Sequence, residues 1–405
     1  MKNLLIFIKK HASFTIIVLG AVAVFLVNIV LKMVLSQEQY GEYSLFISYL
    51  QLMVTFGLLG FDQVFLRISE AVDKKTIQTS KKLIIIILIV WAIFGLFSSI
   101  GFMSFFSGLE INSIYIVICT LSVTASIFLY NIFRLNSSFL ISQFLLNNWR
   151  FILVTLAIAG IYFYKIDLES FIKLFSYFLL ILLVIQSYFT FMRIHFEYSI
   201  VEVPKRIYSF ALNFFIALLT ISIISFGDRF FIKVNFGAIE LGEYFFLATI
   251  FIFPFSLLQG YIGFKELVYY KNLSTEIKIG KKIVMLNFLG ILFGGFLVIC
   301  SIISNQLEIL PYISIKNNIV IVIIFIFTGI LKLNYSLFSA ILGARGEVIT
   351  IRKANVQSIV SIFAILILFY SKLDKLEFIA FIVLLFWLSR IFIWNYNIMK
   401  QLKKS

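Results

Sequence analysis

Charged residues, prolines, cysteines and histidines are all scarce in this chain of 405 residues. Only 13% of the residues are charged, whereas soluble domains carry about 25%, and 62% are apolar, with a mean hydropathy of +1.07. This composition excludes a soluble enzyme with a single membrane anchor and predicts a chain embedded in the membrane. A helix that crosses a bilayer takes about 20 apolar residues, so the chain has room for roughly a dozen spans with short loops.

The few cysteines, histidines and prolines exclude several kinds of site. Cys119 and Cys300 both lie inside apolar runs, so we expect no disulfide framework and no cysteine metal site. His11 and His195 are far apart in basic flanks, which is more typical of interfacial residues than of metal ligands. Three prolines favour an almost entirely helical fold. No metal and no organic cofactor is expected.

Apolar runs that end at charged or turn-forming residues predict twelve membrane-spanning helices. We expect the first run to be an uncleaved span, because it is longer than the apolar core of a signal peptide and no small-residue cleavage site follows it. The predicted spans cover roughly 12–34, 42–66, 83–106, 112–134, 141–164, 171–192, 207–227, 241–263, 283–304, 318–342, 354–371 and 377–398.

The loops predict the orientation of the chain. Of the 34 basic residues, 24 fall on the side that holds both termini, eight on the opposite side and two, Lys332 and Arg390, inside predicted helices. The positive-inside rule then places both termini of this multi-pass membrane protein in the cytoplasm. It also accounts for the net charge of +15 without a nucleic-acid partner. The short loops hold no phosphate-binding loop, so an ATPase is not expected in this chain.

A short motif recurs near mid-chain. The run Gly41-Glu42-Tyr43 follows the first predicted helix, and Gly242-Glu243-Tyr244 follows the seventh, 201 residues later. This spacing predicts a duplication into two lobes of six helices, 1–200 and 201–405. An even number of helices per lobe makes both lobes enter the membrane in the same sense, so they are expected to be related by an axis along the membrane normal. Rocker-type transporters have this architecture, with a binding site between the two halves.

One lysine falls near the middle of a predicted span. A charge at helix centre costs roughly 2.5–3.5 kcal/mol on insertion scales, so Lys332 needs a partner or a hydrated cavity. Thr328, Ser336 and Ser339 share its helix face, and such a polar stripe is typical of a cavity wall. The alternative is a structural ion pair with an acid on a neighbouring helix.

Charges and amides near the membrane core give a wider set of candidate binding residues. Cations outnumber acids among them, and a basic cavity attracts an anion such as the diphosphate of a lipid carrier. The candidates are Asn28, Lys32, Arg67, Arg134, Arg150, Asn213, Asp228, Arg229 and Lys332.

Simpler interpretations stay open for most of these residues. Three of the cations also suit anchors at helix ends, namely Lys32, Arg134 and Arg150. Asp228 could instead pair with a charge on another helix, and Asp62 could form a structural pair with Arg67.

Two runs resemble a known transporter family. The run from Lys32 to Tyr43, with Gly57, Gly60 and Arg67 after it, resembles the start of the oligosaccharide-lipid flippases that export O-antigen and capsule repeat units. The run Gly227-Asp228-Arg229 to Tyr244, followed by Pro254, is similar to the seventh and eighth helices of the same family. These flippases belong to the multidrug/oligosaccharidyl-lipid/polysaccharide exporter superfamily.

The resemblance implies a V-shaped, two-lobed helical bundle with a central cationic cavity. It implies movement of a polyprenyl-diphosphate-linked glycan to the outer leaflet, with membrane lipids, a polysaccharide polymerase and chain-length proteins as partners. Lys32, Arg67, Asp228 and Arg229 match recurrent motif positions, whereas Lys332 is a candidate on the physical argument alone.

Two other functions remain open at this point. A polysaccharide polymerase or lipid-carrier glycosyltransferase is disfavoured because such membrane enzymes typically carry a long outer loop, and the loops here are short. A drug or cation antiporter of the same superfamily is disfavoured because its site needs acids at membrane depth. We therefore expect a transporter that is not an enzyme. The sequence does not choose between a proton, sodium or the membrane potential as the driving force.

Overall fold

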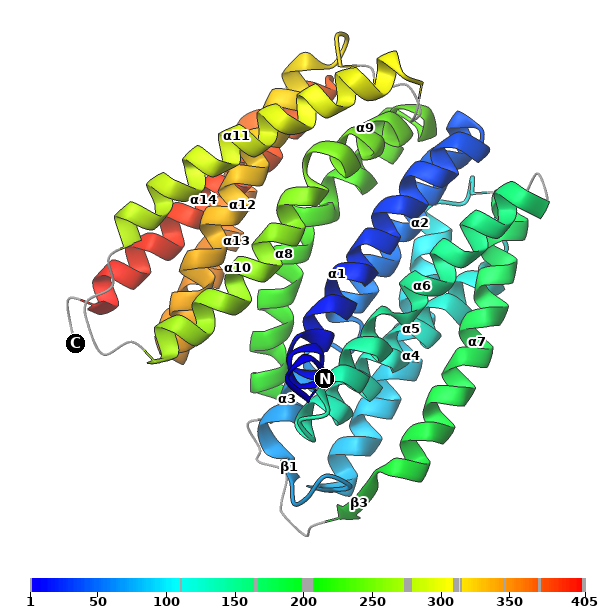
Figure 1. The fold of residues 1–405 in the computed structure, drawn as a ribbon, viewed down its shortest axis with the longest axis vertical. Helices are drawn as coiled ribbons and strands as arrows, with labels where there is room; N and C mark the ends of the chain where they lie inside the picture. Colours follow the sequence, from blue (N-terminus) through cyan, green and yellow to red (C-terminus); the bar gives the residue numbers. More distant parts are fainter. Residues whose placement is uncertain are drawn as a thin grey trace. The chain divides into compact units, whose positions relative to one another are not determined.

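The computed structural model describes residues 2–109, 111–163, 167–198, 207–272, 279–308, 313, 315–345, 347–370 and 373–402. Helices dominate it, at 87% of the described residues (Figure 1). The helices are α1 (Lys2–Val34), α2 (Gln37–Phe56), α3 (Phe61–Ile68), α4 (Lys81–Phe105), α5 (Ser113–Leu135), α6 (Phe139–Phe163), α7 (Leu168–Arg193), α8 (Ile207–Asn235), α9 (Ala238–Phe251), α10 (Phe253–Asn272), α11 (Ile279–Gln306), α12 (Ile319–Arg345), α13 (Val348–Phe369) and α14 (Leu376–Leu402).

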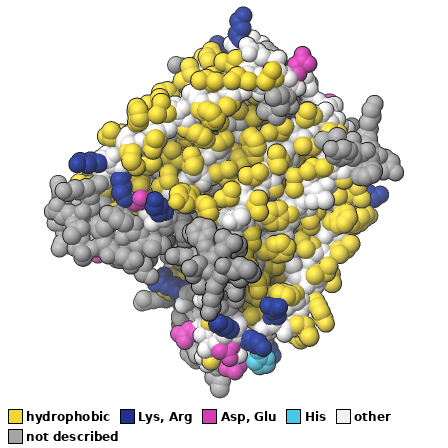
Figure 2. Space-filling view, viewed as in Figure 1, with side chains coloured by type: hydrophobic (Ala, Val, Ile, Leu, Met, Phe, Trp, Pro, Cys, Tyr) yellow, Lys and Arg dark blue, Asp and Glu magenta, His cyan; other side chains and the backbone are white. Residues whose placement is uncertain are grey.

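The described helices make the chain a multi-pass membrane protein. Eleven spans are long and apolar enough to cross a bilayer, or up to twelve when the bent pair α9 and α10 counts as one. The predicted all-α membrane fold is thereby confirmed. Large apolar side chains point outward, such as Phe97, Phe191 and Ile367, which are 71%, 81% and 76% exposed. Figure 2 shows hydrophobic side chains over much of the surface that it colours.

Two of the predicted spans are broken in the structure. The second divides into α2 and α3 at a turn that includes Leu59 and Gly60, both with positive φ (49° and 79°). The eighth divides into α9 and α10 at Ile252, with a bend of 45°. Pro254 lies in the first turn of α10, where the backbone N–H that it lacks would have no partner within the helix. In a continuous helix through α9 and α10 the same proline would remove a backbone hydrogen bond, so the helix breaks here.

The chain forms two compact units, Met1–Leu219 and Thr220–Ser405, and the division falls within α8. The lobe boundary expected between residues 200 and 201 lies outside the described residues. In unit 1, α1 packs along α6, and α5 packs against α4, α6 and α7. In unit 2, α12 packs against both α10 and α14.

A small sheet, which the sequence reading did not predict, lies at one end of unit 1. β2 (Thr76–Thr79) pairs antiparallel with β1 (Glu70–Ala71) and parallel with β3 (His195–Tyr198). The sheet ties the segment after α3 to the end of α7. Asp73 closes the turn between β1 and β2, where its Oδ1 accepts the backbone N–H of Lys75 (2.6 Å) and of Thr76 (2.7 Å). These two hydrogen bonds hold the pKa of the Asp73 carboxyl below its ordinary value.

Candidate functional site

The recurring Gly-Glu-Tyr motif makes the same kind of contact in both units. The Tyr43 hydroxyl on α2 donates a hydrogen bond to Asn28 Oδ1 on α1, at 3.0 Å. The Tyr244 hydroxyl on α9 donates to Asp228 Oδ2 on α8, at 2.8 Å. Both tyrosines are buried, and each reaches back 15 or 16 residues to the preceding helix. The repeated tripeptide therefore carries a repeated interhelical hydrogen bond, with an amide acceptor in unit 1 and a carboxylate acceptor in unit 2.

Unit 2 gathers charged and polar side chains from three spans into what we call the unit 2 polar cluster: Asp228, Arg229, Tyr244, Ser256 and Lys332. Lys332 occupies the midpoint of the 27-residue helix α12. Its ammonium donates a hydrogen bond to Ser256 Oγ, at 2.7 Å, in the first turn of α10. The lysine thus meets the eighth span just beyond its break.

The electrostatics of the cluster are mainly cationic. Asp228 and Arg229 lie within electrostatic range of Lys332. The guanidinium of Arg229 stacks over Phe245, 4.7 Å from the ring centroid. Lys332 forms no ion pair with any carboxylate among the described residues. Two positive groups therefore share one nearby acid, which is already hydrogen-bonded by Tyr244.

An aromatic group on the other side of Lys332 connects it to a second buried cation. Its ammonium lies 5.3 Å from the centroid of the Trp387 ring on α14. Trp387 packs edge-on against Tyr335, whose hydroxyl accepts a hydrogen bond from Arg390 at 3.0 Å. Arg390 is 2% exposed and lies 5.1 Å from the centroid of Trp394. Cation–π contacts and hydrogen bonds thus hold this arginine inside the bundle.

The hydroxyls expected to line a cavity beside Lys332 are largely satisfied within α12. Thr328 Oγ1 donates to the Ile324 carbonyl and Ser336 Oγ to the Leu333 carbonyl. Both residues are buried. The polar contact of Lys332 therefore comes from α10 rather than from its own helix face.

Two of the unit 1 candidates, Lys32 and Arg150, lie beside aromatic rings. Lys32 is half-buried and sits 5.1 Å from the centroid of the Tyr40 ring. Arg150 donates to Asn147 Oδ1 at 3.0 Å and stacks on Trp149. Asn147 in turn packs against Gly20 of α1, where any Cβ would overlap its side chain. The Arg150–Asn147 pair thus lies at the α1–α6 contact.

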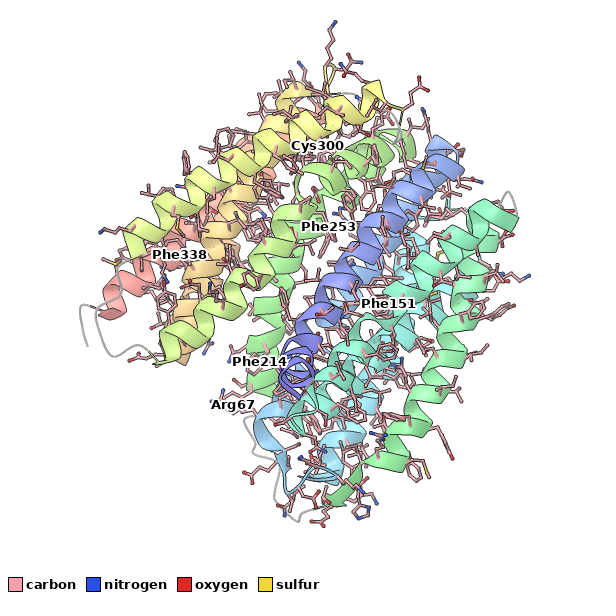
Figure 3. The ribbon with its side chains drawn as sticks, viewed as in Figure 1. Arg67, Phe151, Phe214, Phe253, Cys300 and Phe338 are labelled. Atoms are coloured by element: carbon pink, nitrogen blue, oxygen red, sulfur yellow. The ribbon has the colours of Figure 1, made fainter. Side chains whose placement is uncertain are left out.

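Two predicted site arginines lie on the surface. Arg67 lies exposed in the last turn of α3 (Figure 3). Its guanidinium lies 5.2 Å from the centroid of the Phe210 ring. Arg134 is also exposed and lies over Tyr130. Asp62 does not pair with Arg67, because its carboxylate accepts hydrogen bonds from the amides of Gln63 (2.6 Å) and Asn131 (3.3 Å).

The structure thus brings together Asp228, Arg229 and Lys332, and it leaves Arg67 and Arg134 at the surface of unit 1. Asn213 is half-buried in the part of α8 that belongs to unit 1. Sequence reasoning missed Ser256 and the aromatic partner of Lys332. Pro254 could have pointed to Ser256 in the sequence, because a proline marks the break of the eighth span and Ser256 lies in the same turn.

In the part of the chain that the structure describes, no three His, Cys, Asp or Glu side chains could hold a metal ion. Comparisons with protein-family models, curated proteins and solved structures gave no match to this chain.

Proposed function

We propose that this chain is a flippase that moves polyprenyl-diphosphate-linked oligosaccharide repeat units from the inner to the outer leaflet of the bacterial cytoplasmic membrane. The glycan would serve O-antigen or capsule synthesis, with a polymerase and chain-length proteins acting after it. Both termini lie in the cytoplasm in this proposal. Two six-helix halves provide alternating access, while the prenyl tail stays in the lipid.

The observation that carries the proposal is the cation at mid-membrane. Lys332 stands at the centre of α12 without an ion pair to any described carboxylate, hydrogen-bonded to a turn where the eighth span is broken. A lysine ammonium has three N–H donors, and Ser256 takes one of them. Broken helices at membrane depth are a common site of substrate contact in transporters. A diphosphate is a ligand that suits Lys332 and Arg229 together.

The repeated tyrosine contact supports the two-half architecture. Equivalent positions of the motif, 201 residues apart, make equivalent hydrogen bonds to the preceding helix. In each unit the span that carries this motif is divided into two helices, α2 and α3 in unit 1 and α9 and α10 in unit 2. A duplicated six-helix segment accounts for both features.

The direct test is a leaflet assay on oriented membrane vesicles from cells with and without the gene. Lipid-linked glycan is probed with a membrane-impermeant glycan-cleaving enzyme. The proposal expects intact glycolipid to be trapped on the cytoplasmic face when the gene is lost. Single repeat units that still reach the outer face but stay unpolymerised would instead indicate a polymerase.

A cation antiporter of the same superfamily is the second candidate, and one observation favours it. Asp62 is 6% exposed, and the side-chain hydrogen bonds to its carboxylate come from two neutral amides. A buried acid in neutral surroundings suits reversible binding of a proton or cation. Loss of drug export in Asp62→Asn, with lipid-linked glycan distributed normally, would favour the antiporter over the flippase.

A further inference from the structure

Unit 1 carries an apolar groove at its surface, between α1, α6 and α7. Its volume is about 410 Å³, within the range of about 300–1,000 Å³ for small-molecule pockets. Ile16 of α1, Leu140 and Phe144 of α6, and Ile185 and Phe189 of α7 are among the residues that line it. The groove offers almost entirely hydrocarbon, which suits an alkyl chain.

The walls of the groove are open to the outside of unit 1. Leu140, Phe144 and Ile185 are 49%, 50% and 58% exposed. In a membrane-spanning bundle such side chains meet lipid rather than water. A chain from the surrounding bilayer can therefore enter the groove sideways.

A basic residue stands at one end of the groove. The guanidinium of Arg193, the last residue of α7, lies 4.5 Å from the centroid of the Phe189 ring, which lines the groove. The Arg193 side chain is exposed. A guanidinium stacked on a ring keeps its N–H edge available for phosphate oxygens.

The adjacent sheet adds further positive charge at this end. The backbone N–H of His195 donates to the carbonyl of Lys75 at 2.7 Å, and Asn136 donates to the carbonyl of Lys74 at 3.1 Å. Both lysines are exposed. Glu197 on β3 offsets part of this charge. Among the described side chains, Arg193 is a cation that contacts a ring of the groove.

One polar side chain lies against the groove. Gln186, 4% exposed, sits one helical turn, about 5 Å, before Phe189. Ser126 donates to its Oε1 at 3.1 Å, whereas its Nε2 finds no acceptor in the described part of the chain. Gln186 is one of the residues that line the groove, so this nitrogen is the donor that the groove can offer a ligand. An ester carbonyl is the acceptor that an acyl lipid carries and an isoprenyl chain lacks.

We propose that the groove binds an anionic glycerophospholipid. One acyl chain lies between α1, α6 and α7, an ester carbonyl accepts a hydrogen bond from Gln186, and the phosphate binds Arg193. In the orientation proposed above, this end faces the cytoplasmic leaflet, which is rich in anionic lipid. The site is separate from the unit 2 polar cluster and does not depend on what the protein transports.

The test uses the full chain in nanodiscs of phosphatidylcholine that contain a phosphatidylglycerol with a photoreactive acyl chain. Crosslinks, mapped by peptide mass spectrometry, are expected on α6 and α7 at the groove. Unlabelled phosphatidylglycerol should compete with the probe, and phosphatidylcholine should not. Arg193→Gln should reduce labelling about tenfold, the loss expected for one charge-assisted hydrogen bond, and Gln186→Leu should reduce it less.

Arg352→Gln is the matched control, because it removes an equally exposed arginine in unit 2 and should leave labelling unchanged. Both arginines are on the surface, so the variants should fold, which thermal unfolding verifies. Equal competition by phosphatidylcholine, or full labelling of Arg193→Gln, would overturn the proposal. So would competition by a polyprenyl phosphate but not by phosphatidylglycerol, because the groove would then hold an isoprenyl chain.

Discussion

Replacing Tyr244 with phenylalanine removes one hydroxyl from the contact between α8 and α9 and leaves the ring in place. The ring packs edge-on against Phe325, at 5.0 Å between centroids, so the substitution creates no cavity. Asp228 then loses the hydrogen bond that it accepts at 2.8 Å. Tyr43→Phe makes the same change in unit 1, where the acceptor is the neutral amide of Asn28.

The two substitutions should differ in cost because their acceptors differ in charge. Hydrogen bonds between membrane helices contribute about 0.6 kcal/mol on average and at most about 1.7 kcal/mol. A hydrogen bond to a charged group contributes about 1.5–3 kcal/mol. We therefore expect Tyr43→Phe to lower the free energy of unfolding by about 0.6 kcal/mol and Tyr244→Phe by about 1.7 kcal/mol, the upper limit for membrane helices.

Denaturation of the full chain in mixed micelles measures both losses. A double-mutant cycle with Asp228→Asn assigns the larger loss to the Tyr244–Asp228 pair, and a cycle with Asn28→Ala does the same for Tyr43. Equal losses for the two phenylalanine variants, or no coupling between Tyr244 and Asp228, would refute the reasoning that the unit 2 contact involves an ionised acid.

Two further predictions concern packing and the sheet. Gly294 of α11 lies against Ile326 of α12, where an added methyl group would overlap the Ile326 side chain, whereas none of the described atoms lies near a methyl group at Gly295. Gly294→Ala should therefore be about 1–3 kcal/mol less stable than Gly295→Ala. Equal stabilities of the two variants in detergent unfolding would contradict this packing. Because the pKa of Asp73 is lowered in the fold, its contribution to the turn is present above the ordinary carboxyl pKa and is lost as the pH falls through the lowered value. Asp73→Ala removes the acceptor and should then speed hydrogen exchange at the Thr76 amide at neutral pH. Unchanged exchange would show that the carboxylate does not hold this turn.

The spans could be predicted from the sequence because a backbone in lipid must form its hydrogen bonds internally, and long apolar helices do so. The breaks were harder to predict, because apolar character continues through Leu59 and Ile252. The sheet gave no local signal: β2 pairs with β3 more than a hundred residues later, and each has only four residues.

In the candidate site, the sequence predicts Lys332 but not the residues that surround it. Lys332 stands out in sequence because a lone charge interrupts an apolar run. Its partners, Ser256 and Trp387, come from other helices, and no periodicity within α12 reports them. Asp62 illustrates the same limit, because its amide partner Asn131 lies on α5 and the nearby Arg67 points to the surface.

In the proposed mechanism Lys332 holds an anionic group of the transported lipid, and a substitution at this residue tests that role. Lys332→Met removes the charge but keeps most of the side-chain volume, a change that buried charges often tolerate in folding. Lys316→Ala is the control, since this exposed lysine precedes the same helix. In the leaflet assay we predict that Lys332→Met reaches the membrane in normal amounts and traps lipid-linked glycan on the cytoplasmic face, while Lys316→Ala transports normally. Normal transport by Lys332→Met would contradict the account.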